Sequence, residues 1–144
     1  MNFKNPIALP EGCKIIKLPT IHENRGNLAF LESEKHLPFC VKRVFWIYGV
    51  PIAETRGGHA HWTCAEVVFP INGDFWITVD DGTTQCAIHL NEPNEGLLIP
   101  AGVWCSLYDF SNGAVCIAMA SEAYNVNGYE NNYELYKEKR RKCE

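Results

Sequence analysis

The sequence lacks the features of three common classes of protein. No apolar run approaches the roughly 20 residues that cross a bilayer, so we expect no membrane span. No C-x-x-C pair occurs among the seven cysteines, which argues against a zinc knuckle or a redox dithiol. No basic stripe offers a surface for nucleic acid, since the formal net charge is −4 at pH 7. The one basic cluster, residues 137–142, contains a glutamate and is typical of the solvated end of a helix.

Signals for export and for division into several domains are also absent. Residues 1–6 do not have the charged-then-apolar layout of a signal peptide. Repeats, low-complexity segments and interdomain linkers are missing, so we expect a single domain over residues 1–144. We therefore expect a cytoplasmic protein with reduced cysteines. Most of these cysteines lie within apolar strand patterns, as at residues 115–117, and are expected to fill the core.

What the sequence does have is a series of short, regularly spaced strand patterns. In addition to an extended segment at residues 56–61, we expect strands at residues 13–18, 27–32, 41–48, 65–71, 74–79, 84–90, 96–99, 104–110 and 114–121. Hairpin signals follow at Asn72-Gly73 and at Asp81-Gly82. Only residues 131–142 have a helical pattern. The arrangement predicts an all-β sandwich or barrel with a short C-terminal helix.

The most informative segment is R-G-G-H-A-H at residues 56–61, followed by Glu66. Two histidines one residue apart on a strand point to the same face, and a nearby carboxylate can rejoin that face. Such a group can bind a metal or move protons. The spacing resembles the first motif of the cupin barrels, and P-A-G-V-W-C at residues 100–105 resembles the second, with Cys105 where cupins carry a histidine. The alternative, a surface strand with incidental histidines, is disfavoured because the two motifs occur together.

Over most of its length the chain resembles the sugar 3,4-ketoisomerases of the cupin superfamily. The matching segments are residues 24–28, 37–39, 41–44, 56–61, 79–82, 103–104, 109–111 and 120–122, with Tyr124 close behind. The resemblance implies a double-stranded β-helix, or jelly-roll barrel, and a homodimer with exchange of N-terminal strands. It also implies catalysis without metal or other cofactor. The implied substrate is thymidine-diphosphate-linked 4-keto-6-deoxyglucose, used for unusual deoxy- or amino-sugars of surface polysaccharides.

The implied reaction, moving a ketone from C4 to C3, needs a base of near-neutral pKa and donors for an enediolate. We expect His61 as the base, because it lies deeper in the strand, and His59 as its partner. Arg56 and Arg25 are expected to bind the diphosphate or the enolate, since guanidinium grips phosphate in a fork geometry. For Arg25 only the family match favours this role over that of a turn residue before a strand.

Several residues depart from the family pattern near the expected pocket. The family motif R-V-Y-Y-I falls on residues 43–47, where Trp46 replaces the second tyrosine. Cys105 and Tyr108 stand where the family has histidines, and Trp62 and Glu66 replace a lysine and a glutamine. We expect Trp46, Tyr108, Cys105 and Glu66 to contact the substrate, with Tyr108 the candidate to restore a hydroxyl. The changes imply an altered substrate, an altered reaction or a lost activity.

Two other functions remain open. The first is a metal-dependent cupin enzyme, in which His59, His61, Glu66 and Cys105 bind zinc or iron. The second is a non-catalytic module that binds a nucleotide sugar.

For the dimer, we expect the strand at residues 13–18 to be exchanged between chains, because this would cover an open sheet edge.

Overall fold

The computed structural model describes residues 8–143, which form two five-stranded antiparallel sheets, one two-stranded hairpin and a C-terminal helix. Residues 1–6, in which the sequence shows no signal-peptide layout, lie outside the described range. The strands are β1 (Lys14–Lys17), β2 (Thr20–Glu23), β3 (Gly26–Ala29), β4 (Arg43–Tyr48), β5 (Arg56–His61), β6 (Glu66–Asn72), β7 (Phe75–Asp80), β8 (Gln85–Leu90), β9 (Glu95–Ile99), β10 (Trp104–Tyr108), β11 (Val115–Ala120) and β12 (Tyr129–Glu130). A 3₁₀ turn, η1 (Val126–Gly128), precedes β12, and α1 spans Tyr133–Lys142.

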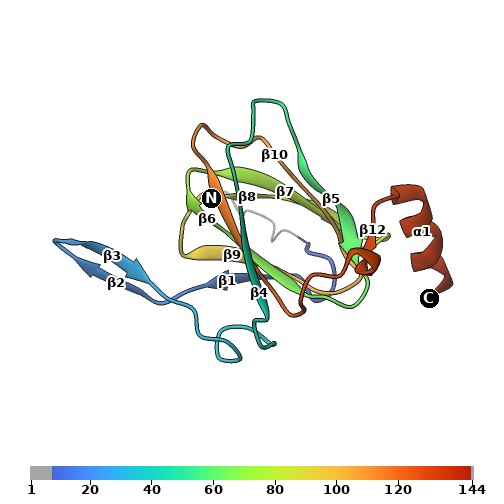
Figure 1. Cartoon of the computed structure of the whole chain (residues 1–144), viewed down its shortest axis with the longest axis horizontal. Helices are drawn as coiled ribbons and strands as arrows, with labels where there is room; N and C mark the ends of the chain where they lie inside the picture. The colour runs from blue at the N-terminus through green and yellow to red at the C-terminus, as the bar shows by residue number, and fades with distance from the viewer. Residues whose placement is uncertain (1–7, 144) are drawn as a thin grey trace, which may run out of the picture.

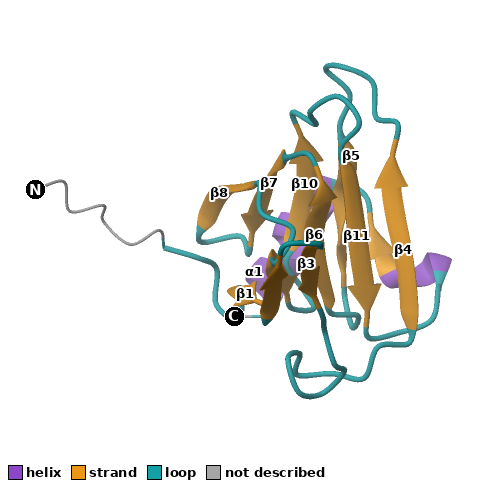
Figure 2. Ribbon diagram, turned by 90° about the vertical axis from the view of Figure 1, so that its left-hand side faces the viewer, coloured by secondary structure: helices purple, strands orange, loops and turns teal. Residues whose placement is uncertain are grey.

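The two large sheets stack face to face (Figures 1 and 2). One has the strand order β1-β9-β6-β11-β4 and the other β12-β5-β10-β7-β8. The expected all-β architecture with a short C-terminal helix is therefore confirmed. Within residues 8–143, the structure contains no helix of the length and apolarity that a bilayer crossing requires.

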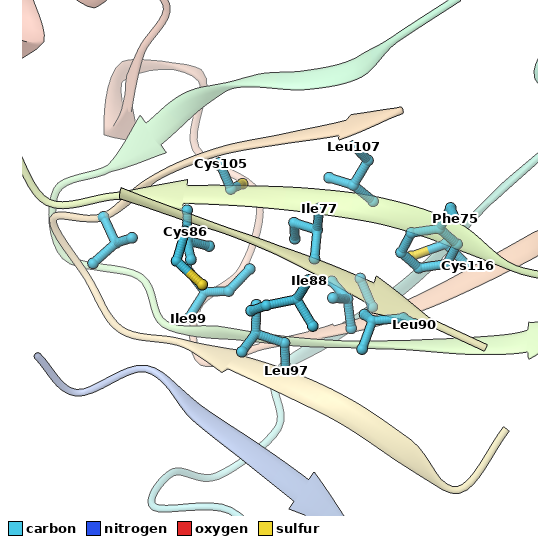
Figure 3. Packing of buried hydrophobic residues seen from close by; sticks show 14 residues of the cluster. Phe75, Ile77, Cys86, Ile88, Leu90, Leu97, Ile99, Cys105, Leu107 and Cys116 are labelled. Carbon is cyan, nitrogen blue, oxygen red and sulfur yellow. The ribbon is translucent and has the colours of Figure 1, made fainter. Parts of the chain in front are cut away.

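The core lies between the sheets, where inward positions alternate with outward ones. On β7 the side chains of Phe75, Ile77 and Val79 are fully buried. They belong to one buried cluster with Leu97 of β9, and Figure 3 labels Phe75, Ile77 and Leu97. Burying each such side chain contributes about 1.5–3 kcal/mol. Four cysteines are buried as free thiols, and three of them join this core, as expected for core filler: Cys64, Cys86, Cys105 and Cys116.

A second apolar cluster covers the outer face of the first sheet. It contains Ile16, Val67, Phe69 and Leu98, and partly buried side chains from residues 31–41 pack on it. The cover stops short of β4, the edge strand of this sheet. There Val44, Trp46 and Tyr48 form an exposed row.

The N-terminal strands form two separate pairings within the chain. β1 pairs with β9 of the same chain, because this places Ile16 in the outer cluster while its neighbours Lys14 and Lys17 stay exposed. The structure describes one chain, so the exchange of residues 13–18 between two chains stays a prediction. Among the described strands, β2 and β3 pair only with each other. The hairpin that they form projects from the sandwich on the side opposite α1 (Figure 1).

The helix α1 is fixed to the second sheet by its tyrosines. Tyr136 is fully buried, and its hydroxyl lies 2.8 Å from the carbonyl oxygen of Asp80 and 2.7 Å from that of Gly102. The Tyr133 hydroxyl donates to the Asp80 carboxylate. At the start of the helix, the Asn132 side chain accepts a hydrogen bond from the Leu135 backbone N–H. These contacts also hold β12, which precedes the helix, against β5.

Candidate functional site

The histidine motif lies on β5, and two glycines shape the strand just before it. Gly57 and Gly58 have φ angles of 77° and 72°, a region that favours glycine. A Cβ on Gly57 would lie 3.1 Å from the Cys105 carbonyl oxygen, so the strands also approach too closely for a side chain. The β5–β10 register shifts at this point, between Cys105 and Ser106. The resulting bulge sets the direction of His59.

The two imidazoles share a face, as expected, and a tyrosine completes a cluster of three rings. The ring centroids of His59 and His61 are 4.9 Å apart. Tyr129 on β12 pairs directly with His61 across the β5–β12 ladder. Its ring centroid is 4.3 Å from that of His61 and 5.0 Å from that of His59. The segment after the sandwich therefore forms one wall of the site.

Glu66, the first residue of β6, returns to the histidine face across the short β5–β6 connection. Its Oε1 lies 2.7 Å from Nε2 of His61, and these two residues are 5 % and 8 % exposed. The direction of approach falls outside hydrogen-bond geometry. The pair is thus a close contact between a carboxylate and an imidazole whose Nε2 is not committed to a hydrogen bond.

Arg43 links this pair to the tyrosine. Its Nη2 is 3.8 Å from Oε1 of Glu66, and its Nη1 donates a hydrogen bond of 3.2 Å to the Tyr129 hydroxyl oxygen. Burial alone lowers the pKa of Arg43, but the hydrogen bond to Tyr129 and the charge of Glu66 outweigh burial and raise it. A fixed positive charge therefore lies between the carboxylate and the phenol.

Burial sets the protonation of two further groups. Burial, with the neighbouring His61, lowers the pKa of His59, so this imidazole is neutral at pH 7. Burial, with the charge of Glu66, raises the pKa of the Cys105 thiol well above its ordinary value. Cys105 is therefore a neutral thiol at pH 7.

A cavity of about 230 Å³ opens onto these groups. Its lining comprises Phe45, Trp46, Ile47, Arg56, Gly57, His59, Glu66, Val68, Cys105, Leu107, Ala118 and Tyr129. A second cavity of about 370 Å³ is bounded by the β4–β5 loop. The two cavities share Trp46, Ile47 and Arg56. Arg56 is therefore a cation at the boundary between two adjacent spaces.

The structure brings together most of the residues that the sequence indicates. His59, Glu66, Cys105 and Arg56 line the smaller cavity, and His61 lies behind them in contact with Glu66. Arg25 is not part of this group within one chain. It lies at the turn of the β2–β3 hairpin, where its 88 % exposed side chain forms a 2.7 Å ion pair with Glu23.

Tyr108 and Trp46 both occupy outward positions on their strands. On β10, the buried side chains are Cys105 and Leu107, so the alternation places Tyr108 on the outer face, opposite Trp76 of β7. On β4, Phe45 pairs with Ala118 of the inner core.

Trp46 pairs instead with Ile117, which belongs to the outer cluster. The indole is 60 % exposed, so Trp46 borders the cavities from outside while Phe45 faces inward. Strand alternation thus directs Tyr108 away from the smaller cavity, whereas Trp46 remains at the border of both cavities.

Sequence reasoning assigned no role to Arg43 or Tyr129. Arg43 occupies an inward position on a strand whose other inward positions are apolar, which is a signal for a buried charge with a partner. Tyr129 gives no comparable signal, because β12 has only two residues and its pairing with β5 is not visible in the sequence.

The four residues of the metal-binding alternative do not form one group. Among residues 8–143, the ligand atoms that come within 4.8 Å of one another belong to His61, Cys64 and Glu66. Cys105 is therefore replaced by Cys64 in any such set. The Arg43 guanidinium, 3.8 Å from a Glu66 oxygen, opposes a cation here.

Comparison with known proteins gives consistent matches. Residues 11–141 match the family model FdtA, described as WxcM-like, C-terminal. The TDP-4-oxo-6-deoxy-alpha-D-glucose-3,4-oxoisomerase of Aneurinibacillus thermoaerophilus is 35% identical over 124 residues, covering 86% of this chain and 89% of the relative.

Two solved structures are also similar. The 3,4-ketoisomerase from Helicobacter canadensis has a TM-score of 0.87 at 35% identity, covering 90% of this chain and 98% of that one. A histidine-to-asparagine mutant of the 3,4-ketoisomerase QdtA from Thermoanaerobacterium thermosaccharolyticum has a TM-score of 0.90 at 32% identity, covering 93% and 97%. The latter structure is a complex with TDP-4-keto-6-deoxyglucose.

Proposed function

The chain belongs to the FdtA family of WxcM-like proteins, and from this premise we propose how its site works. The protein is a cupin-like sugar-nucleotide 3,4-ketoisomerase, which shifts the keto group between C4 and C3 of a TDP-linked 4-keto-6-deoxyhexose in deoxysugar synthesis. The observation that carries the mechanism is the His59–His61 pair beside Glu66 at a cavity of sugar size.

We propose that His61 is the base that removes the proton from C3. A base that becomes an imidazolium needs a carboxylate to stabilise the new charge, and Glu66 lies 2.7 Å from its Nε2. His59 has no such contact, and its lowered pKa keeps it neutral. The neutral imidazole of His59 can therefore hydrogen-bond to the sugar and relay protons. The sugar must reach the inner end of the cavity, beside Glu66, to meet His61.

The two adjacent cavities suit the two parts of the substrate. We assign the sugar to the smaller cavity, where Cys105 contributes an uncharged wall, and the nucleotide to the larger one. Arg56 then lies where the diphosphate joins them, and its guanidinium binds phosphate oxygens in pairs. Trp46 contacts the nucleotide from the rim. Tyr108 has no role in this arrangement.

We also propose a homodimer, in which the hairpin is the exchanged element. An isolated two-stranded hairpin is marginal in water, and this one exposes Ile21 and Leu28. The partner's exposed row of Val44, Trp46 and Tyr48 is a matching apolar surface. Such packing would carry Arg25 toward the partner's cavities, which explains how a residue remote from its own site can bind substrate.

Two features of the protein as a whole complete the proposal. Both large sheets share one core, so we treat residues 1–144 as one domain. All seven cysteines are free, which suits the reducing cytoplasm. Catalysis is assigned to the histidines and not to a metal.

The experiment that tests the activity is isotope exchange. Purified protein is incubated with TDP-4-keto-6-deoxyglucose in deuterium oxide, and C3 is followed by NMR. We expect the C3 proton to be replaced by deuterium while the 3-keto product accumulates. Binding of TDP without exchange or product would contradict the isomerase and favour the non-catalytic binding module.

A further inference from the structure

We propose that Tyr129 is a catalytic acid–base residue that gives a proton to the sugar's C4 oxygen and recovers one from the C3 hydroxyl. The inference rests on the proposed proton-transfer function, since it supplies the partner that the histidines need. Moving a ketone between adjacent carbons requires protons to shift on both oxygens as well as on both carbons. The histidines serve the carbons, and a separate group is needed at the oxygens.

Tyr129 supplies a hydroxyl group to the lining of the smaller cavity. Most of the other inward-facing lining is apolar, from Phe45, Val68, Leu107 and Ala118. The remaining polar groups are Arg56, His59, Glu66 and the neutral thiol of Cys105. Among the described residues that line this cavity, Tyr129 alone carries a hydroxyl.

Arg43 prepares this hydroxyl for proton transfer in two ways. Guanidinium has donors and no acceptor, so the 3.2 Å bond from Nη1 occupies the phenol oxygen and leaves the phenol's own proton free to donate. The same positive charge stabilises the phenolate that forms when the proton leaves. Arg43 is itself held between Glu66, 3.8 Å away, and the face of Phe45, 5.2 Å from Cζ. It is therefore a positioning residue for Tyr129.

The arrangement also places the phenol next to the base. Tyr129 pairs with His61 across the ladder and touches both imidazole rings. A sugar whose C3 faces His61 therefore presents the neighbouring C4 oxygen within the same ring cluster. Acid and base then act on adjacent atoms of one substrate.

The steps balance without an outside reagent. His61 takes the C3 proton, the electrons of that bond form a C3–C4 double bond, and the C4 oxygen takes the proton of Tyr129. The resulting phenolate, beside Arg43, then takes the proton of the C3 hydroxyl as the C3 carbonyl forms. C4 receives a proton from the imidazolium of the histidine pair. Both residues return to their starting state.

The test replaces Tyr129 with phenylalanine, which keeps the ring contacts and removes the hydroxyl. We expect kcat for keto transfer to fall about 10²–10⁴-fold, with the Kd for TDP within about twofold and the melting temperature within a few degrees. Tyr124→Phe is the matched control, because it removes an exposed hydroxyl from the same segment and keeps its ring over Arg43. It should retain wild-type kcat.

A fluorotyrosine at position 129 separates chemistry from packing. It keeps an O–H that is more acidic, so it should restore most of kcat and move any alkaline fall of kcat to lower pH. A Tyr129→Phe protein with wild-type kcat would overturn the proposal, as would parallel losses of kcat and TDP binding, which indicate a packing role. A wild-type protein without C3 exchange would contradict the proposed function itself, and is therefore measured first.

Discussion

Tyr129 lies directly opposite His61 in the β5–β12 pairing, with the two ring centroids 4.3 Å apart. These residues are far apart in the sequence, and the helix α1 that follows β12 holds them together. The site is therefore built from a motif strand and from a segment that belongs to the last part of the chain. The predictions below concern residues of both segments.

The two histidines should not be equivalent. We expect His61→Asn to lower C3 exchange by about 10²–10⁴-fold while TDP binding is retained, because asparagine keeps a polar side chain of similar size without the basicity. His59→Asn should have a smaller or product-specific effect. Exchange measured by NMR decides this, and equal exchange in wild type and both variants would remove the histidines from the mechanism.

The lowered pKa of His59 predicts a pH dependence of stability. The unfolded chain binds a proton on this histidine near its ordinary pKa of 6.5, whereas the folded protein resists it. The free energy of unfolding should therefore be highest above pH 6.5 and should fall as the pH is lowered from 6.5 toward the folded pKa. Urea unfolding at pH 7.5 and pH 5.5 measures the loss, which should be smaller in His59→Asn. An equal loss in both proteins would refute the assignment.

Purified protein should contain no stoichiometric metal. The His61–Cys64–Glu66 group has the ligand types of a zinc site, but the Arg43 charge opposes a cation there. Elemental analysis of protein prepared without chelator checks this. About one zinc or iron per chain would support the metal-dependent alternative, and loss of that metal in Cys64→Ser would locate it.

The hairpin should determine both assembly and substrate affinity. Leu28→Asp places a charge on its apolar surface and should shift the protein from dimer to monomer in sedimentation at micromolar concentration, whereas Ile52→Asp in the exposed β4–β5 loop should not. Arg25→Ala should raise KM by roughly 10–100-fold, as expected for a lost hydrogen bond to a charged group. A monomeric wild-type protein would contradict the dimer.

Tyr108 should be dispensable for catalysis. Its side chain lies on the outer face of β10, so Tyr108→Phe should change kcat and KM by less than about threefold, as is usual for surface positions away from special features. Steady-state kinetics of Tyr108→Phe and Tyr129→Phe, measured side by side, show which of the two hydroxyls serves the reaction. A large loss in Tyr108→Phe would place its hydroxyl in the site after all.

The sequence predicts most strands between residues 65 and 121 to within about two residues, because Asn72-Gly73 and Asp81-Gly82 fix the hairpins. It also predicts the shared face of His59 and His61, because strand periodicity determines it. It does not predict that Phe45 faces inward and Trp46 outward, since that choice depends on the pairing of β4 with β11. The strand period marks Arg43 as an inward charge, but its partner Tyr129 is not predictable, because a contact between two short, distant segments leaves no periodic pattern.

The anchoring of α1 through Tyr136 has a consequence for the integrity of the site. Tyr129 reaches His61 because β12 pairs with β5, and the helix that follows β12 is docked by Tyr136 against Asp80 and Gly102. A remote contact on the far side of the second sheet thereby supports one wall of the site. Damage to the tail of the domain would therefore reach the chemistry before it reached the core of the sandwich.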